Sequence, residues 1–142
     1  MSLLNVFDVT GSAMAAQSIR LNTTASNLAN ANSVTSNVGD TYRARHPVFA
    51  AALSASQGAD APLGGQTSGV QVLDIIESEA PLDLRYEPDH PYADEQGYVA
   101  YPNVNVVEEM ADMISASRSF QMNVEMLHSA RTLAERLLTL GQ

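Results

Sequence analysis

The sequence lacks cysteine and lysine altogether. Without cysteine the chain has no disulfide, no thiolate metal site and no cysteine nucleophile. Its positive side chains are seven arginines, which face 16 acidic residues, so the formal net charge is −9. A chain this acidic is a poor match for nucleic acid or for an anionic membrane surface, and we expect it to bind neither.

Long apolar runs are also missing. No segment approaches the roughly 18–20 apolar residues of a membrane span. No basic segment opens the chain, because Arg20 is the first positive side chain. We therefore predict neither direct membrane insertion nor a cleaved Sec signal peptide. Only 16% of the 142 residues are charged and 45% are hydrophobic, which fits one folded unit rather than a disordered chain.

Along the first thirty residues, apolar and small side chains recur at alternating steps of three and four, the spacing of a helix that packs on another helix. Large residues lie seven apart and alternate with small ones, which permits close helix packing. The predicted amino-terminal assembly seam comprises Leu4, Phe7, Gly11, Met14, Ser18, Leu21, Ala25 and Leu28. Glycine inside a helix costs ~1 kcal/mol relative to alanine, so we expect close backbone approach at Gly11.

A second helix is predicted after Pro102, because Asn105 followed by Glu108 resembles a capping box. Its predicted assembly seam comprises Val106, Met110, Met113, Ser117, Phe120, Val124, Leu127, Ala134 and Leu137. Arg131 falls on this seam, so we expect a stutter in the repeat after Leu127.

The middle of the chain has a different composition. Residues 33–69 are rich in small and polar residues and predict an extended loop. Short strands are predicted over 70–76, 82–86 and 98–101, where apolar residues alternate or cluster. The predicted fold class is mainly α, with two long terminal helices that form an antiparallel coiled coil and a middle segment that carries a small β hairpin or meander. The predicted coiled-coil core comprises 1–32 and 104–142, and the middle segment 33–103 contains the loop 33–69 and the β region 70–101.

The first helix is polar but almost uncharged outside its seam. Between Leu3 and Asn32, only Asp8 and Arg20 carry charge. The remaining amides and hydroxyls are poor helix formers in water. We infer a helix that becomes ordered in a packed assembly, where these groups hydrogen-bond to neighbouring chains. An ordinary amphipathic helix in a small bundle is the alternative.

Residues that carry chemistry in other proteins do not form a recognisable site. His46, His90 and His128 lie in different segments and lack the paired spacing of metal ligands. The acidic run from Asp83 to Glu95 holds two prolines and shows no pocket that would raise the pKa of a catalytic acid. We therefore predict no catalytic residue, no cofactor and no metal ion.

Seven stretches of the chain carry distinctive combinations of residues: 12–18, 20–22, 25–32, 42–49, 94–99, 102–110 and 115–123. Together they resemble the flagellar axial rod/hook protein family, and within it the proximal rod subunits. The polar residues of this signature are Asn22, Asn27, Asn30, Asn103, Asn105 and Asn123. The resemblance covers both ends of the chain and much of its middle.

The resemblance implies a structural subunit of the bacterial flagellar basal-body rod, which supports motility without catalysis. Such subunits leave through the flagellar type III export apparatus without a cleaved signal peptide. They stack helically with further copies and with other rod proteins into a hollow drive shaft that spans the periplasm from the inner-membrane ring and export gate toward the hook. The terminal helices then form an inner coiled coil around the export channel, and the middle segment faces outward.

Two rival functions stay open on the sequence. A soluble coiled-coil adaptor or export chaperone of a type III secretion system has the same helical periodicity. A peptidoglycan-cleaving enzyme would use a pair of carboxylates, for which Asp89 and Asp94 are the candidates.

Overall fold

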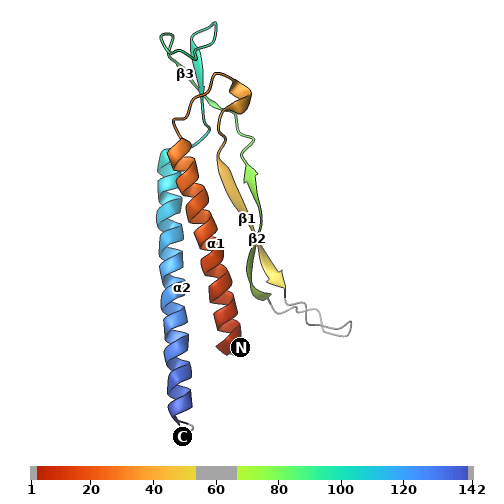
Figure 1. Cartoon of the computed structure of the whole chain (residues 1–142), viewed down its shortest axis with the longest axis vertical. Helices are drawn as coiled ribbons and strands as arrows, with labels where there is room; N and C mark the ends of the chain where they lie inside the picture. Colours follow the sequence, from red (N-terminus) through yellow and green to blue (C-terminus); the bar gives the residue numbers. More distant parts are fainter. Residues whose placement is uncertain (1–2, 54–66, 141–142) are drawn as a thin grey trace, which may run out of the picture.

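The computed structural model describes residues 3–53 and 67–140. Its elements, in order, are the helix α1 (Leu3–Asn30), the 3-10 turn η1 (Val38–Asp40), the strands β1 (Arg45–Leu53), β2 (Thr67–Glu77), β3 (Asp83–Tyr86) and β4 (Tyr98–Tyr101), and the helix α2 (Val106–Leu140). The two helices lie side by side and run in opposite directions (Figure 1). The β1–β2 hairpin lies along the other side of α1, and β3–β4 lies beyond the start of α2.

The strands form two separate two-stranded antiparallel sheets, β1–β2 and β3–β4. β1 falls inside the predicted loop, and it pairs with β2 from Arg45 opposite Glu77 to Leu53 opposite Thr67. A register shift between Val48 and Phe49 adds a bulge to the hairpin. Residues 54–66 of the predicted loop lie outside the described residues.

The predicted fold class is wrong. A mainly α protein built as an antiparallel coiled coil was expected, whereas the structure combines two helices with two antiparallel sheets. The predicted meander over 70–101 is also wrong, because β2 pairs with β1 rather than with β3. β1 escapes prediction because Ala50, Ala51 and Ala52 have low strand propensity. Pairing with β2 and packing against α1 make this segment a strand.

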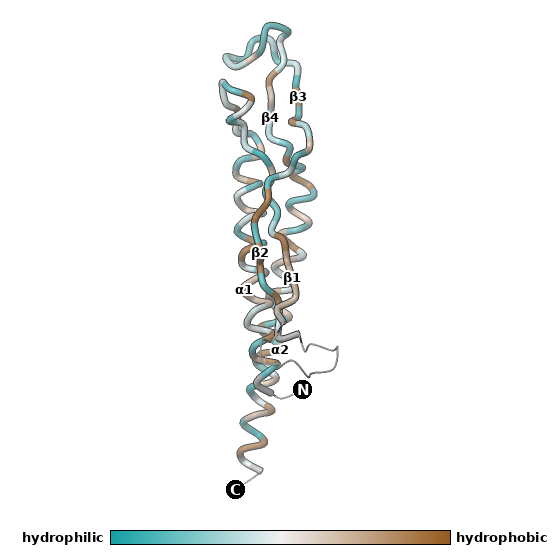
Figure 2. Tube along the Cα trace, turned by 90° about the vertical axis from the view of Figure 1, so that its right-hand side faces the viewer, coloured by the Kyte–Doolittle hydropathy of each residue, from teal (hydrophilic) through white to brown (hydrophobic). Residues whose placement is uncertain are grey.

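The core is small and is lined mostly by short side chains. Its buried apolar members include Ala16, Ala31, Ala116 and Ala130. Among the described residues, Val99 is the largest apolar side chain that is fully buried. Short side chains let the helices approach closely. Many large apolar residues are therefore left exposed, and hydrophobic residues are visible along β1 and β2 in Figure 2. Within the described chain, neither helix combines the length and hydrophobicity required to cross a membrane.

Candidate assembly site

A polar cluster joins the two helices to the start of the hairpin. Its centre is the amide of Asn27, which is 1% exposed. Asn27 Nδ2 donates to Glu109 Oε1 at 2.9 Å and to the carbonyl oxygen of Arg45 at 2.8 Å. Asn27 Oδ1 accepts from the Arg45 N–H at 2.9 Å and from the Tyr42 hydroxyl at 2.8 Å. The amide thus uses its whole hydrogen-bonding capacity and fixes α1, α2 and β1 relative to one another.

The start of α2 supports this cluster. Asn105 Oδ1 accepts from the N–H groups of Val107 and Glu108 at 3.1 and 3.4 Å, and α2 begins at Val106. This confirms the helix start predicted from Asn105. Glu109 follows in the first turn, where the helix dipole favours negative charge, and its side chain is buried against Asn27.

An ion pair connects the helices about two turns along α1 from Asn27. Arg20 Nη2 lies 2.7 Å from Asp112 Oδ1, and the two side chains are 31% and 39% exposed. A pair this exposed contributes at most about 1 kcal/mol to stability. Its main effect is to hold one register between α1 and α2.

A second cluster ties the segment between β2 and β3 to the start of β1. Asn103 Oδ1 accepts from the Ala44 N–H at 2.8 Å, and Asn103 Nδ2 donates to the Ala80 carbonyl at 2.9 Å. Arg43 Nη1 donates to the carbonyls of Ser78 and Ala80 at 3.2 and 3.1 Å. One asparagine and one arginine thereby fix the junction from which β3 and β4 project.

The six signature asparagines therefore have different roles. Asn27 and Asn103 bridge distant segments, and Asn105 caps α2. Asn30 and Asn123 each donate only within their own helix, to the carbonyls of Ser26 and Ser119 at 2.8 and 2.9 Å. Asn22 is exposed and lines a hollow between α1 and β2. Among the described residues, Asn27 and Asn103 are thus the signature asparagines whose side chains hydrogen-bond between distant segments.

The far end of the hairpin is attached to α1 at Ser12. The Val70 N–H donates to Ser12 Oγ at 3.1 Å, and Ser12 Oγ donates to the Val9 carbonyl at 2.9 Å. Gly69 has a φ of +146°, and a Cβ placed there would collide with Ser12 Oγ. Only glycine allows β2 to approach α1 this closely. Nothing in the sequence pattern indicated this contact.

The buried face of α2 shares Met113, Phe120, Leu127 and Ala134 with the predicted seam and differs from it at the other positions. It comprises buried or half-buried residues at steps of three and four: Glu109, Met113, Ala116, Phe120, Asn123, Leu127, Ala130 and Ala134. Of the remaining predicted seam residues, Ser117 is half-buried, whereas Val106, Met110, Val124 and Leu137 are exposed. The observed repeat continues past Arg131, which is exposed, without the expected stutter. Ala116 and Ala130 lie inside because short side chains bring α2 close to α1.

The predicted seam of α1 is only partly covered. Its half-buried members are Phe7, Gly11, Met14, Leu21 and Leu28. Ser18 and Ala25 are exposed, and the side chain of Leu4 lies outside the described part of the chain. A Cβ added to Gly11 would meet no atom within 4 Å. The close approach expected at Gly11 is therefore not made within the single chain.

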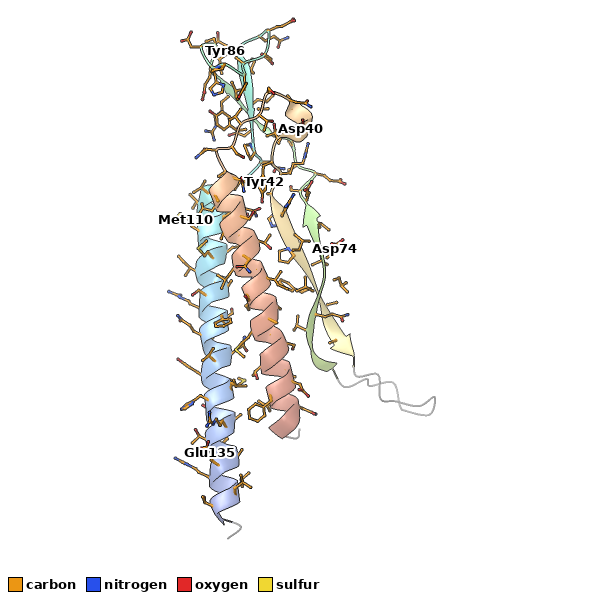
Figure 3. The ribbon with its side chains drawn as sticks, in the orientation of Figure 1. Asp40, Tyr42, Asp74, Tyr86, Met110 and Glu135 are labelled. Carbon is orange, nitrogen blue, oxygen red and sulfur yellow. The ribbon has the colours of Figure 1, made fainter. Side chains whose placement is uncertain are left out.

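Two groups of large apolar residues lie exposed on α2. The upper outer cluster is Val107, Met110 and Ile114, and the lower outer cluster is Met122, Met126, Leu133 and Leu137. Each of these side chains is at least 51% exposed. Figure 3 shows Met110 pointing away from α1. Groups of exposed large apolar side chains are typical of protein interaction sites.

The residues considered for catalysis and metal binding have other roles or lie exposed. Asp94 Oδ1 accepts from the N–H groups of Gln96 and Tyr98 at 2.9 and 2.8 Å, so this carboxylate shapes a turn. Asp89, His46 and His128 are exposed, and His90 Nδ1 accepts from the Tyr92 N–H at 3.1 Å. Among the described residues, no three histidine or acidic side chains are grouped as metal ligands.

Comparison with known proteins gives consistent matches over the whole chain. The family model "Flagella basal body rod protein" matches residues 7–37, and "Flagellar basal body rod FlgEFG protein C-terminal" matches residues 95–140. The chain is similar to the flagellar basal-body rod protein FlgC of Salmonella typhimurium, with 53% identity over the full length of both chains. The FlgC proteins of Yersinia enterocolitica and Borreliella burgdorferi are 51% and 34% identical, and the alignments cover all of this chain and 100% and 99% of theirs.

Proposed function

Because the chain belongs to the FlgC family of flagellar basal-body rod proteins, we propose that its terminal helices stack helically with those of neighbouring subunits. As a rod protein, the chain is a structural subunit of the basal body that assembles with other rod components. The stack forms a hollow shaft that transmits torque from the motor to the hook. The exposed apolar residues of α2 carry this proposal. The family is a structural one, and it favours neither a soluble adaptor or export chaperone nor a peptidoglycan-cleaving enzyme.

The chemistry of α2 suits contact with several different neighbours. Burial of apolar surface contributes about 25 cal/mol per Å2 without fixed direction. Three of the seven outer-cluster residues are methionines, whose unbranched side chains adapt to irregular surfaces. Open helical stacking needs heterologous contacts, in which different faces of the subunit meet. Outer clusters on α2 and uncovered seam residues on α1 supply two such faces.

We further propose that the subunit leaves through the flagellar type III export apparatus without a cleaved signal peptide. It then occupies the part of the rod that meets the inner-membrane ring and export gate, and the rod spans the periplasm from there. The two terminal parts predicted as the core, 1–32 and 104–142, form the inner layer, and the middle segment 33–103 faces outward. The β1–β2 hairpin on the side of α1 opposite α2 supports this order of layers.

The assembly role of the upper outer cluster is tested by Ile114→Asp. Ile114 is 55% exposed, so we expect the free energy of unfolding of the isolated chain to change by less than about 0.5 kcal/mol. Rod assembly should fail, because the new carboxylate would be buried at the interface between subunits without a positively charged partner. Swimming in soft agar and recovery of hook-basal bodies measure assembly, and urea unfolding measures stability.

The matched control for Ile114→Asp is His128→Asp, which adds the same charge at an exposed polar position of α2 outside both clusters. It should leave motility intact. A motile Ile114→Asp strain, or equal loss of assembly in both strains, would contradict the proposed contact.

Gly11→Ala tests whether a neighbouring subunit packs against the face of α1 that the single chain leaves uncovered. In the isolated chain, Gly11→Ala should raise the free energy of unfolding by about 0.5–1 kcal/mol, because alanine favours helix and its Cβ meets no atom within 4 Å. In the rod, the same methyl group should hinder a neighbouring subunit and reduce motility. Gly39→Ala is the control, since a Cβ added to Gly39 in η1 would come no closer than 3.6 Å to its nearest atom, Asn37 Oδ1. A stabilised chain that assembles normally would show that no neighbour approaches Gly11.

A further inference from the structure

An exposed aromatic surface lies at the end of the molecule that β3 and β4 form. Tyr86 pairs with Tyr98 across the two strands, and strand alternation places Leu84 on the same face as both tyrosines. Leu84, Tyr86 and Tyr98 are 63%, 65% and 41% exposed, and we call them the tip face. Figure 3 shows Tyr86 at this end of the chain, well separated from Met110 of the upper outer cluster.

The tip face is held rigidly before any partner binds. The rings of Tyr86 and Tyr98 meet edge to face, with centroids 5.4 Å apart. Gly97 has a φ of +86°, and a Cβ there would lie 2.9 Å from Tyr86 Cε2. The Glu87 N–H donates to the Gly97 carbonyl at 2.9 Å, and the Tyr98 N–H donates to Asp94 Oδ1 at 2.8 Å. Rigid aromatic side chains lose little conformational entropy on binding.

The opposite face of the same sheet is already occupied within the chain. The Arg85 guanidinium lies over the Tyr101 ring, 4.3 Å from its centroid. The Tyr101 hydroxyl donates to Glu87 Oε2 at 3.1 Å. Burial, and then the hydrogen bond and negative charge of Glu87, raise the pKa of Tyr101 above its ordinary value. Tyr101 is therefore held in place, and Tyr86 and Tyr98 are the tyrosines of the sheet left for a partner.

Negative charge surrounds the tip face. Residues 78–101 contain six acidic side chains and one arginine, which gives a net charge of −5 out of −9 for the chain. Four of the acids, Glu87, Asp89, Asp94 and Glu95, lie in the loop that joins β3 to β4. A positively charged partner is attracted to this end of the molecule and an anionic one is repelled.

We propose that the tip face docks a protein partner that presents arginine side chains, with a guanidinium group stacked on Tyr86. Arginine combines a delocalised charge with a planar group that stacks on aromatic rings, which lysine lacks. The chain already makes this contact twice, between Arg85 and Tyr101 and between Arg45 and Tyr42. Loop carboxylates beside the ring then accept the remaining N–H groups of the guanidinium.

A different protein fits this surface better than a second copy. Five of the seven arginines of the chain already bind other groups within it: Arg20, Arg43, Arg45, Arg85 and Arg131. A second copy would also bring its own charge of −9. The docking surface is independent of helix stacking, so it is testable on the isolated full chain.

The test uses a synthetic 16-residue amphipathic peptide with four arginines and one tryptophan, and a second peptide with four lysines in their place. The chain has no tryptophan, so selectively excited tryptophan emission reports on the peptide alone. We expect the arginine peptide to bind at least threefold more tightly than the lysine peptide. Tyr86→Ala should abolish that preference, and chemical shifts of tip-face residues should follow the arginine titration.

Charge-matched variants separate docking from general attraction to an acidic chain. Asp89→Asn with Glu95→Gln removes two tip charges, and Glu108→Gln with Glu125→Gln removes two exposed charges of α2. The first pair should weaken binding at least fivefold and the second less than twofold. Equal affinities for both peptides, equal losses in both pairs, or self-association of the chain that Tyr86→Ala abolishes would each overturn the proposal. None of these results bears on rod assembly, which Ile114→Asp tests separately.

Discussion

Asn27→Ala is expected to lower the free energy of unfolding of the isolated chain by about 3 kcal/mol. The substitution removes four hydrogen bonds of 2.8–2.9 Å. Each such bond contributes about 1 kcal/mol, and a buried group left without its partner costs about 1–3 kcal/mol. The carboxylate of Glu109, which is 5% exposed, loses the donor from Asn27. Urea unfolding followed by circular dichroism measures the change. If the free energy of unfolding falls with urea concentration at the same slope in both proteins, the substitution has altered stability alone.

The matched control for Asn27→Ala is Asn123→Ala. Asn123 also lies inside a helix, but its amide donates only to the Ser119 carbonyl of the same helix. We expect a change within about 0.5 kcal/mol, since alanine's higher helix propensity offsets the lost local bond. Tyr42→Phe should give an intermediate loss of about 1 kcal/mol, because it removes one bond to Asn27. Similar results for the two asparagines would show that the cluster does not hold the helices and hairpin together.

Gly69→Ala is expected to detach the end of the hairpin from α1. A Cβ at Gly69 would collide with Ser12 Oγ and lie 3.0 Å from Ser12 Cβ, and the φ of +146° is unfavourable for alanine. We estimate a local cost of about 2 kcal/mol, which corresponds to a roughly 30-fold loss of amide protection. Hydrogen exchange at the Val70 N–H, which donates to Ser12 Oγ, measures this loss directly.

The effect of Gly69→Ala should be local and partly reversible. Amides of α2 should keep their protection, because α2 makes its contacts with α1 rather than with the hairpin. Adding Ser12→Gly removes the colliding side chain together with the acceptor of the Val70 N–H. The double variant should therefore leave Val70 unprotected, whereas the neighbouring amides of the hairpin recover part of their protection while the backbone strain stays. Unchanged exchange at Val70 in Gly69→Ala would refute the close contact between β2 and α1.

Helix positions were predicted well, because local signals specify them. Asn105 marked the start of α2, and its side chain accepts from the first-turn N–H groups as expected. The apolar steps of three and four correctly indicated α1 and α2. Which face of α2 meets α1 was not predictable from the same steps, since Met110 and Val124 fit the repeat as well as Ala116 and Ala130. Close approach favours the short side chains, and this selection requires two helices in contact.

The sequence by itself determined two terminal helices, the cap of the second, and a likeness to flagellar axial proteins, since each rests on residues within a few turns of one another. Only the tertiary structure decided that an alanine-rich segment becomes β1, that Asn27 meets Glu109, and that Gly69 meets Ser12. These partners lie far apart along the chain, 82 residues for Asn27 and Glu109. Contacts over such separations leave no periodic signal, because they form only when packing has brought the segments together.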